Sequence, residues 1–160
     1  MPKIHPFLWF DDRAEEAMNF YVSIFPNSKV LNVTRYGPGS PGAEGSVMTA
    51  DFELDGQRVT ALNGGPNFSF SEAVSFVIDC EDQAEVDHYW DRLVEGGAPS
   101  QCGWLKDRFG FSWQVVPRQI FETLGGPDPE GRKRAMAAML RMRKLDVGEL
   151  QAAYEGRPAA

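Results

Sequence analysis

The sequence is poor in the residues that form disulfides and bind metals. Its 160 residues include two cysteines and two histidines. Cys80 and Cys102 form no C-x-x-C pair, and neither stands at a metal-type spacing from His5 or His88. The sequence therefore offers no zinc motif, and reduced thiols are the default expectation.

Positive charge and long apolar runs are also scarce. The net charge is −7 and the pI is about 4.8. The basic residues at 132–134 and 141–144 are best interpreted as the solvated face of a helix, so we expect no nucleic-acid partner. No apolar run approaches the roughly 20 residues that a membrane helix needs. The first residues, MPKIHPFLWF, lack the design of a signal peptide. We therefore expect a cytoplasmic protein with no membrane partner.

Motifs for nucleotide binding and nucleophilic catalysis are missing as well. Residues 37–42, GPGSPG, match G-x-G-x-x-G literally. The phosphate-binding motif needs a strand that leads into a helix N-terminus, whereas here a strand follows and prolines occupy two variable positions. We reject dinucleotide binding on this ground. No G-x-S-x-G motif and no Cys–His nucleophile pair is readable either.

The first half contains one strand, one helix and three more strands. Ile4–Phe10 reads as a strand that places His5, Phe7 and Trp9 on one face. Asp12 is predicted to cap the following helix, with Glu15 as its capping-box partner. Asp55-Gly56 is a strong hairpin signal. The expected strands are Lys29–Tyr36, Ser46–Leu54 and Gln57–Asn63.

The second half repeats this pattern when it is aligned so that Ser75 pairs with His5. A strand ending at Cys80 is followed by Asp82 as the cap and by a helix that closes at Gly96-Gly97. A short segment near Ala98–Gln101 comes next, and then a hairpin of sequence CGWLKDRFGFSWQVVP at residues 102–117. In its second strand Phe111, Trp113 and Val115 form one face and Gln114 lies on the other.

The chain resembles the vicinal-oxygen-chelate superfamily, which includes glyoxalase I, bleomycin-resistance proteins and extradiol dioxygenases. The resemblance is strongest to its PhnB-like, or demethylubiquinone-methyltransferase-like, subgroup. It is carried by IHPFLWFDDRAEEAMNFYVSIFPNSKV at residues 4–30, FSFSEAVSFVIDC at residues 68–80 and the aromatic hairpin. The resemblance implies an α+β fold of two βαβββ units with curved mixed sheets and outer helices.

The implied organisation has three parts. Residues 1–117 form a paired domain, with unit one at 1–66 and unit two at 67–117. Residues 118–160 form a C-terminal helical extension that needs a surface to cover. The resemblance and these surplus apolar helices together predict a homodimer.

In this family the sheet interior is a cup that holds a divalent metal or an organic ligand. Metal ligands come from the first and last strands of each unit. Carried over residue by residue, these positions fall on His5, on Ser75, on Ala61 or Asn63 depending on register, and on Gln114. Only His5 is a strong divalent-metal ligand, so the resemblance implies a weakened metal site, with His5 and Gln114 as its candidate ligands.

The predicted function follows from this weakened ligand set and an aromatic cup face. We predict a protein that binds a small organic ligand through residues on the cup face and in the adjoining loop, namely His5, Phe7, Trp9, Asn63, Phe68, Phe70, Ser75, Val77 and Gln114. No cofactor is then needed. The alternative is a divalent-metal-dependent lyase, isomerase or dioxygenase. It would use His5 and Gln114, with Glu53 or Asp79 as a replacement carboxylate ligand. A methyltransferase ranks last, because no strand–loop–helix unit suited to S-adenosylmethionine is visible.

Overall fold

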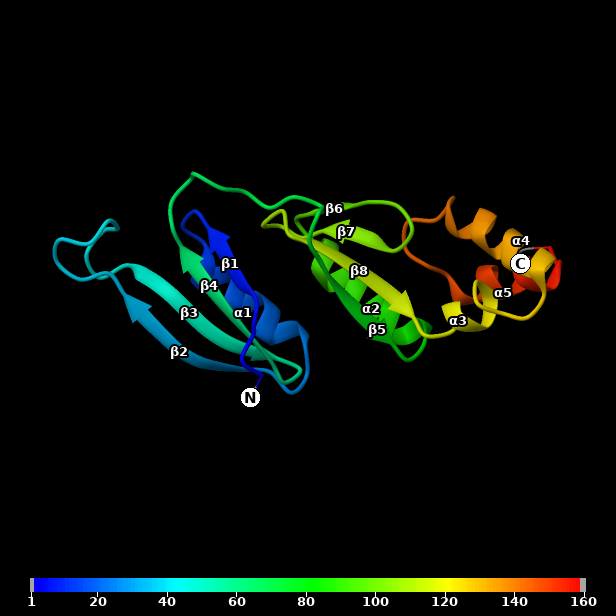
Figure 1. The fold of residues 1–160 in the computed structure, drawn as a ribbon, viewed down its shortest axis with the longest axis horizontal. Coiled ribbons are helices and arrows are strands. Elements are labelled where there is room, and N and C mark those ends of the chain that lie inside the picture. The colour runs from blue at the N-terminus through cyan, green and yellow to red at the C-terminus, as the bar shows by residue number, and fades with distance from the viewer. Residues whose placement is uncertain (1, 159–160) are drawn as a thin grey trace. The chain divides into compact units, whose positions relative to one another are not determined.

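The computed structural model describes residues 2–158 and divides the chain into two compact units. The first unit ends at Phe70 and the second begins at Ser71. Each unit contains one four-stranded sheet and runs strand, helix, strand, strand, strand (Figure 1). This α+β arrangement of two βαβββ units confirms the predicted fold class.

The first unit is a mixed sheet in which the chain's first and last strands lie side by side. The strands follow the order β1-β4-β3-β2, and β1 pairs with β4 in parallel while the other pairs are antiparallel. The elements are β1 (Phe7–Phe10), α1 (Ala14–Ile24), β2 (Lys29–Arg35), β3 (Val47–Leu54) and β4 (Gln57–Asn63).

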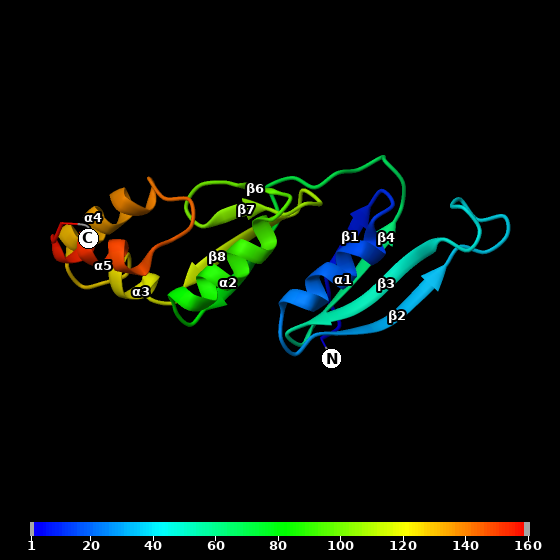
Figure 2. The same cartoon turned by 180° about the vertical axis from the view of Figure 1, so that it is seen from behind.

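Helix α1 covers one face of this sheet, and the opposite side is here called the open face (Figure 2). The buried residues of α1 are Ala14, Ala17, Met18, Tyr21 and Ile24, which recur at helical spacing along one side. Tyr21 meets Phe52 of β3, with ring centroids 6.4 Å apart. Alternation along the strands then sends every second side chain to the open face.

Two sequence predictions near the N-terminus need correction, the start of β1 and the cap of α1. Strand β1 begins at Phe7 and not at Ile4, although Pro6 O still accepts a hydrogen bond from Thr60 N at 3.1 Å. The helix N-cap is Arg13, which makes no side-chain capping bond, so the prediction that Asp12 caps the helix was wrong. Instead Asn63 Oδ1 accepts a hydrogen bond from Ala14 N at 2.8 Å. A side chain from β4 therefore satisfies a free N–H group at the helix start.

The β3–β4 hairpin forms as predicted. Asp55 and Gly56 connect the strands with φ angles of 48° and 80°. Two successive positive φ angles define the turn type that matches the twist of a two-residue hairpin. This turn fixes the register that sets Asp51 opposite Thr60 and Glu53 opposite Arg58.

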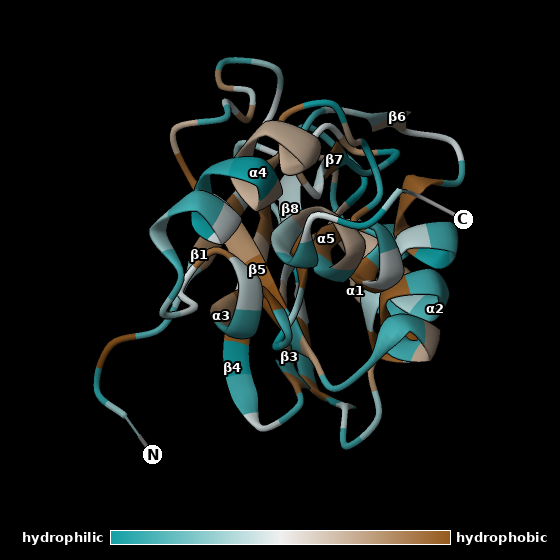
Figure 3. Ribbon diagram, turned by 90° about the vertical axis from the view of Figure 1, so that its right-hand side faces the viewer, coloured by the Kyte–Doolittle hydropathy of each residue, from teal (hydrophilic) through white to brown (hydrophobic). Residues whose placement is uncertain are grey.

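The second unit repeats the topology of the first. Its strand order is β5-β8-β7-β6, with β5 parallel to β8. Figure 3 shows β5 coloured mainly as hydrophobic. Its elements are β5 (Ser75–Cys80), α2 (Gln83–Val94), β6 (Ala98–Pro99), β7 (Trp104–Lys106) and β8 (Ser112–Pro117).

Local capping and turn chemistry in the second unit agree with the sequence. Asp82 caps α2 by accepting a hydrogen bond from Glu85 N at 2.9 Å. The β7–β8 turn is held by Asp107, whose buried carboxylate accepts hydrogen bonds from Phe111 N at 3.0 Å and from Trp113 Nε1 at 2.9 Å. This carboxylate ties the turn to the buried aromatic face of β8.

The C-terminal helices pack within the second unit. They are α3 (Ile120–Thr123), α4 (Pro129–Met139) and α5 (Val147–Glu155), and the predicted extension to residue 160 is described up to residue 158. Ala138, Met142, Leu145 and Leu150 form a cluster of buried side chains there. No helix within residues 2–158 has the length and apolar character needed to cross a membrane.

Candidate functional site

The open face of the first unit carries a row of polar side chains on its central strands. Phe7 of β1 lies beside Thr60 of β4, and Thr60 lies opposite Asp51 of β3. His5 precedes β1 and continues its alternation, so its side chain reaches the same face. The strand register, and not sequence proximity, therefore gathers these four residues.

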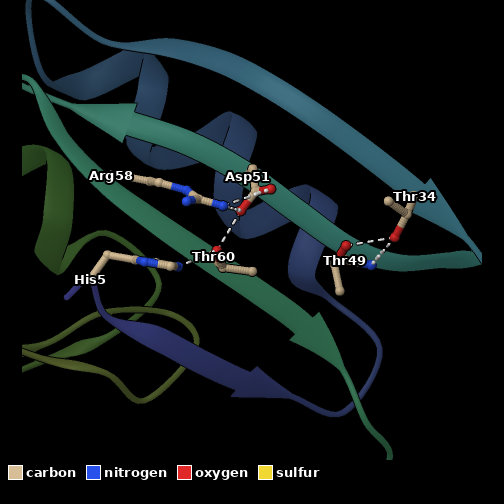
Figure 4. A network of polar contacts seen from close by, with 6 residues as sticks. All are labelled: His5, Thr34, Thr49, Asp51, Arg58 and Thr60. Carbon is tan, nitrogen blue, oxygen red and sulfur yellow. Dashed lines mark hydrogen bonds and ion pairs between the residues drawn. The ribbon is translucent and has the colours of Figure 1, made fainter. Parts of the chain in front are cut away.

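A continuous hydrogen-bond chain runs along this row (Figure 4). His5 Nε2 lies 3.0 Å from Thr60 Oγ1. Thr60 Oγ1 donates to Asp51 Oδ1, and Arg58 Nη2 lies 3.4 Å from both oxygens of the same carboxylate. Thr60 is buried, whereas His5 is half-buried. The chain thus joins an imidazole, a hydroxyl, a carboxylate and a guanidinium.

His5 was expected at this site from the sequence, whereas Thr60, Asp51 and Arg58 were not. Each of these three occupies an alternate position of its strand, on the same side as Glu53, which was singled out as a replacement carboxylate. Glu53 instead pairs with Lys29, with Nζ and Oε2 3.8 Å apart. The missing signal was the pairing of β3 with β4, which the Asp55-Gly56 turn already specifies.

Aromatic side chains border the hydrogen-bond chain. Phe7 is 56% exposed. Trp9 is held by a hydrogen bond from its Nε1 to Gly65 O at 2.9 Å, and it meets Phe68 edge-on with ring centroids 4.9 Å apart. A Cβ atom at Gly64 would lie 2.4 Å from Cζ2 of Trp9, so glycine is required there. The predicted residues Phe7 and Trp9 therefore share the face of His5, and Phe68 packs against Trp9 further along the strand. Phe7 offers the most open apolar surface on β1.

Two other predicted site residues have different surroundings. Phe70 packs edge-on against Phe10, with centroids 5.2 Å apart, and Phe10 is buried under the helix side of the sheet. Asn63 also faces the helix side, because it bonds Ala14 N and donates to Val47 O at 3.1 Å. Ala61 is buried on that side as well. Neither register option for the last strand thus joins His5, because Thr60 and Leu62 hold the alternating positions.

Asn63 does line a different hollow in the first unit. This hollow has a volume of about 530 Å³ and lies between the start of α1 and the loop that connects β2 to β3. Its lining residues include Asp11, Asp12, Glu15 and Tyr36. Tyr36 Oη donates to Asn63 O at 2.5 Å, so two of the lining residues are joined by a hydrogen bond.

The second unit places its predicted residues together on its own open face. Ser75 and Val77 of β5 share this face with Gln114 of β8, as the strand register requires. Gln114 Nε2 donates to Ser75 Oγ at 2.9 Å. Val77 is 52% exposed, and Asp79 is also exposed on the same side. The amide at the centre of β8 is therefore partnered by the residue that aligns with His5.

The donor set does not fit a tight metal site within either unit. Among residues 2–158, no three or more His, Cys, Asp or Glu side chains gather as metal ligands would. His5 Nε2 is already hydrogen-bonded to Thr60, and Ser75 and Gln114 are weak neutral ligands bonded to each other.

Cys80 is not suited to act as a nucleophile. Burial, with the nearby charge of Glu85, raises the pKa of its thiol to about 12.

Comparisons with known proteins match most of the chain. The family model described as 3-demethylubiquinone-9 3-methyltransferase matches residues 2–116. A solved structure titled as a putative 3-demethylubiquinone-9 3-methyltransferase, PhnB protein, from Bacillus cereus is 38% identical, with a TM-score of 0.68. The alignment covers 72% of this chain and 99% of that one. A search of curated proteins found no significant match.

More distant structures share the fold. A protein from Pseudomonas aeruginosa is 20% identical with a TM-score of 0.62, covering 73% of this chain and 98% of that chain. The fosfomycin resistance protein FosX from Listeria monocytogenes, solved with Mn(II) and sulfate, is 15% identical with a TM-score of 0.53. That alignment covers 78% of this chain and 98% of FosX. At these identities the likeness extends to the fold alone.

Proposed function

The chain belongs to the PhnB-like family described as 3-demethylubiquinone-9 3-methyltransferase, within the vicinal-oxygen-chelate superfamily, and we propose that it binds a small organic molecule. The binding surface is the open face of the first unit, around His5, Thr60 and Phe7. The observation that carries the proposal is the polar chain from His5 to Arg58 beside an exposed aromatic ring. Ligand sites typically combine apolar walls with a few placed polar groups.

The open face of the second unit is a further candidate surface for the same ligand. Ser75, Val77 and Gln114 offer a hydroxyl, an exposed apolar group and an amide. Gln114 uses its N–H group on Ser75, so its carbonyl oxygen is the atom left to accept from a ligand. In the first unit, the proposal also assigns Trp9 and Phe68 as aromatic residues that contact the ligand.

A ligand screen with matched variants tests the proposal. Aromatic compounds are screened by ligand-observed NMR, and hits are repeated on Phe7→Ser and Val30→Ser. Both residues are exposed apolar strand residues, but Val30 pairs with Phe52 on the helix side of the sheet. We expect Phe7→Ser to weaken binding by about tenfold or more, since burying an aromatic side chain contributes about 1.5–3 kcal/mol, and Val30→Ser to leave it unchanged. Equal losses, or no hits at all, would sink the proposal.

Metal-dependent chemistry is the second candidate, and metal content distinguishes the two. The protein is incubated with Ni²⁺, Mn²⁺, Fe²⁺ or Zn²⁺, desalted and analysed by mass spectrometry, together with His5→Ala. Stoichiometric metal that is lost in His5→Ala would favour a lyase, isomerase or dioxygenase over simple binding. The mismatched donor set described above is the reason this candidate ranks below organic-ligand binding.

Methyl transfer ranks last despite the family description. The connection from β1 to α1 reads Asp11-Asp12-Arg13, and that from β5 to α2 reads Glu81-Asp82. Neither is the glycine-rich turn that a nucleotide-like cofactor needs at a helix N-terminus. A calorimetric titration with S-adenosylmethionine tests the point, and saturable binding would reverse the ranking.

We also propose that the protein is a homodimer. The support is the apolar surface left on the C-terminal helices after their own cluster has formed. Phe121 is 72% exposed, Leu140 is 59% exposed and Met136 is 44% exposed. Exposed apolar side chains that gather on one part of a fold are typical of protein interaction surfaces.

A further inference from the structure

The donor and acceptor of each hydrogen bond from His5 to Asp51, on the open face of the first unit, can be assigned from the chemistry of the groups. The carboxylate of Asp51 can only accept, and it is paired with Arg58. The hydroxyl group of Thr60 therefore donates its one proton to the hydrogen bond with Asp51. The contact between His5 Nε2 and Thr60 Oγ1 at 3.0 Å must then be donated by the imidazole. A neutral His5 is thus held with its proton on Nε2.

The opposite ring nitrogen of His5 is consequently an acceptor. In a neutral imidazole only one nitrogen carries a proton, so Nδ1 keeps its lone pair. Within residues 2–158, the one hydrogen bond that His5 makes is through Nε2. The backbone bond from Thr60 N to Pro6 O fixes the chain next to the ring. Partners that hold one ring nitrogen in this way set both the tautomer and the orientation of the ring.

We propose that Nδ1 of His5 accepts a hydrogen bond from the ligand's hydroxyl group, so that the ligand is a hydroxylated aromatic compound. This inference rests on the proposed binding function. The need for a hydrogen-bond donor follows from the tautomer, and we assign that donor as a hydroxyl group. The aromatic ring follows from Phe7, which lies beside Thr60 and is 56% exposed. Thr60 and Asp51 are positioning residues, because they act on the ligand through His5. An aromatic ring against Phe7 gains offset or edge contacts beyond simple burial.

The tautomer can be measured without any ligand. The protein has two histidines, so His88→Gln leaves His5 as the one ring in a long-range ¹H–¹⁵N spectrum. His88 is an exposed residue of α2 and has no part in the chain. At a pH of about 8, where an ordinary imidazole is neutral, Nδ1 of His5 should show the shift of an unprotonated nitrogen and Nε2 that of a protonated one. The reverse pattern would overturn the inference.

Threonine variants test the positioning role. Thr60→Val removes the hydroxyl with little change of shape, and Thr60→Ser retains it. Thr49→Val is the matched control, since Thr49 lies on the same face and bonds Thr34 at 2.5 Å (Figure 4). We expect the two His5 tautomers to mix in Thr60→Val and to remain as in the wild type in Thr60→Ser and Thr49→Val. An unchanged tautomer in folded Thr60→Val would refute the role of Thr60.

A pair of ligands tests the hydroxyl preference. Binding of a phenol is compared with that of its O-methyl ether, which keeps the ring but cannot donate. We expect wild type to prefer the phenol by about fivefold, as the net effect of one hydrogen bond, and Thr60→Val to lose the preference. Equal binding of both compounds to wild type would overturn this inference but leave the proposed binding function standing. No hit from the whole aromatic screen, with the expected tautomer, would refute the binding function.

Discussion

At the scale of the single residue, Asn63 shows how one side chain joins a helix to its sheet. Its oxygen accepts from Ala14 N at the start of α1, and its nitrogen donates to Val47 O on β3. Its own carbonyl accepts from Tyr36 Oη. The side-chain amide at the end of β4 therefore satisfies the helix start and a neighbouring strand, and the backbone carbonyl of the same residue holds Tyr36, which follows β2.

Replacing Asn63 with alanine should destabilise the protein by about 1–3 kcal/mol. The change leaves the N–H group of Ala14 and the carbonyl of Val47 without partners, and each unsatisfied group carries a desolvation cost of that order. Urea unfolding followed by circular dichroism measures the loss. Asn32→Ala is the control, because Asn32 is exposed on β2, and it should change stability by less than about 0.5 kcal/mol. Equal effects would show that Asn63 has no capping role.

The same residue marks a limit of reading a sequence locally. Asp82 was identified as a cap because its partner, Glu85, is three positions away. Asn63 caps α1 from 49 positions away, which no local motif indicates. For the same reason His5 was recognised from its own strand, whereas Asp51 and Thr60 became visible only once β3 and β4 were paired. Their alternation and the turn that pairs their strands were readable, but no local motif indicated the contact with His5.

At the scale of the element, α2 anchors the segment that leads into α5. Gln83 donates to Leu145 O at 3.1 Å and accepts from Val147 N at 2.8 Å. Lys144 lies 3.2 Å from Asp87 Oδ1 and 3.1 Å from Asp91 Oδ1. The segment also bonds the start of β7, where Gly103 N donates to Arg143 O at 2.8 Å. The C-terminal helices are thus attached to the second unit by both backbone and charged contacts.

The attachment through Lys144 should depend on pH. The hydrogen bond from Gln83, followed by the bond and charge of Lys144, lowers the pKa of Asp87 against the opposing effect of burial. Burial lowers the pKa of Lys144, but bonds and charges from Asp91 and Asp87 outweigh it and raise the value. A lowered carboxyl pKa stabilises the fold above the usual pKa of about 3.9, and that stability is lost as the pH falls through the folded value. The raised lysine pKa stabilises below about 10.4, and is lost as the pH rises through the folded value.

Lys144→Gln should therefore cost stability at neutral pH and much less in acid. The expected loss is up to about 1 kcal/mol near pH 7, since the pairs are partly exposed. It should shrink as the pH falls through the lowered pKa of Asp87, so that it is clearly smaller at about pH 2. Urea unfolding at both pH values measures the difference. Lys133→Gln, an exposed residue of α4, serves as the control. A loss of the same size at both pH values would mean that Lys144 acts through packing of its aliphatic stem.

At the scale of the whole molecule, the repeat explains why two differently equipped open faces exist in one chain. Both units follow the same topology. His5, just before β1, aligns in sequence with Ser75 at the start of β5. One carries an imidazole linked to a carboxylate through a hydroxyl, and the other a hydroxyl linked to an amide. The shared fold thus provides similar positions, and the residue types give the two open faces different polar groups.

The C-terminal helices, which lie beyond the family match at residues 2–116, lead to the last prediction. Their buried side chains, including Leu145 and Leu150, are occupied within the second unit, so a deletion would damage its core. Phe121 and Leu140 remain exposed and can be changed without that damage. The double variant Phe121→Ser, Leu140→Ser should weaken a dimer at least about a hundredfold, because each buried side chain contributes about 1.5–3 kcal/mol.

Sedimentation velocity over a range of concentrations measures the predicted change in association. Val30→Ser, Leu31→Ser is the matched control, since these are exposed apolar residues of β2 in the first unit. Dimeric wild type and control, with a folded monomeric Phe121→Ser, Leu140→Ser variant, would place the interface on the C-terminal helices. A monomeric wild type would contradict the dimer itself. A dimer that persists in the helix variant but dissociates in the β2 variant would move the interface to the first unit.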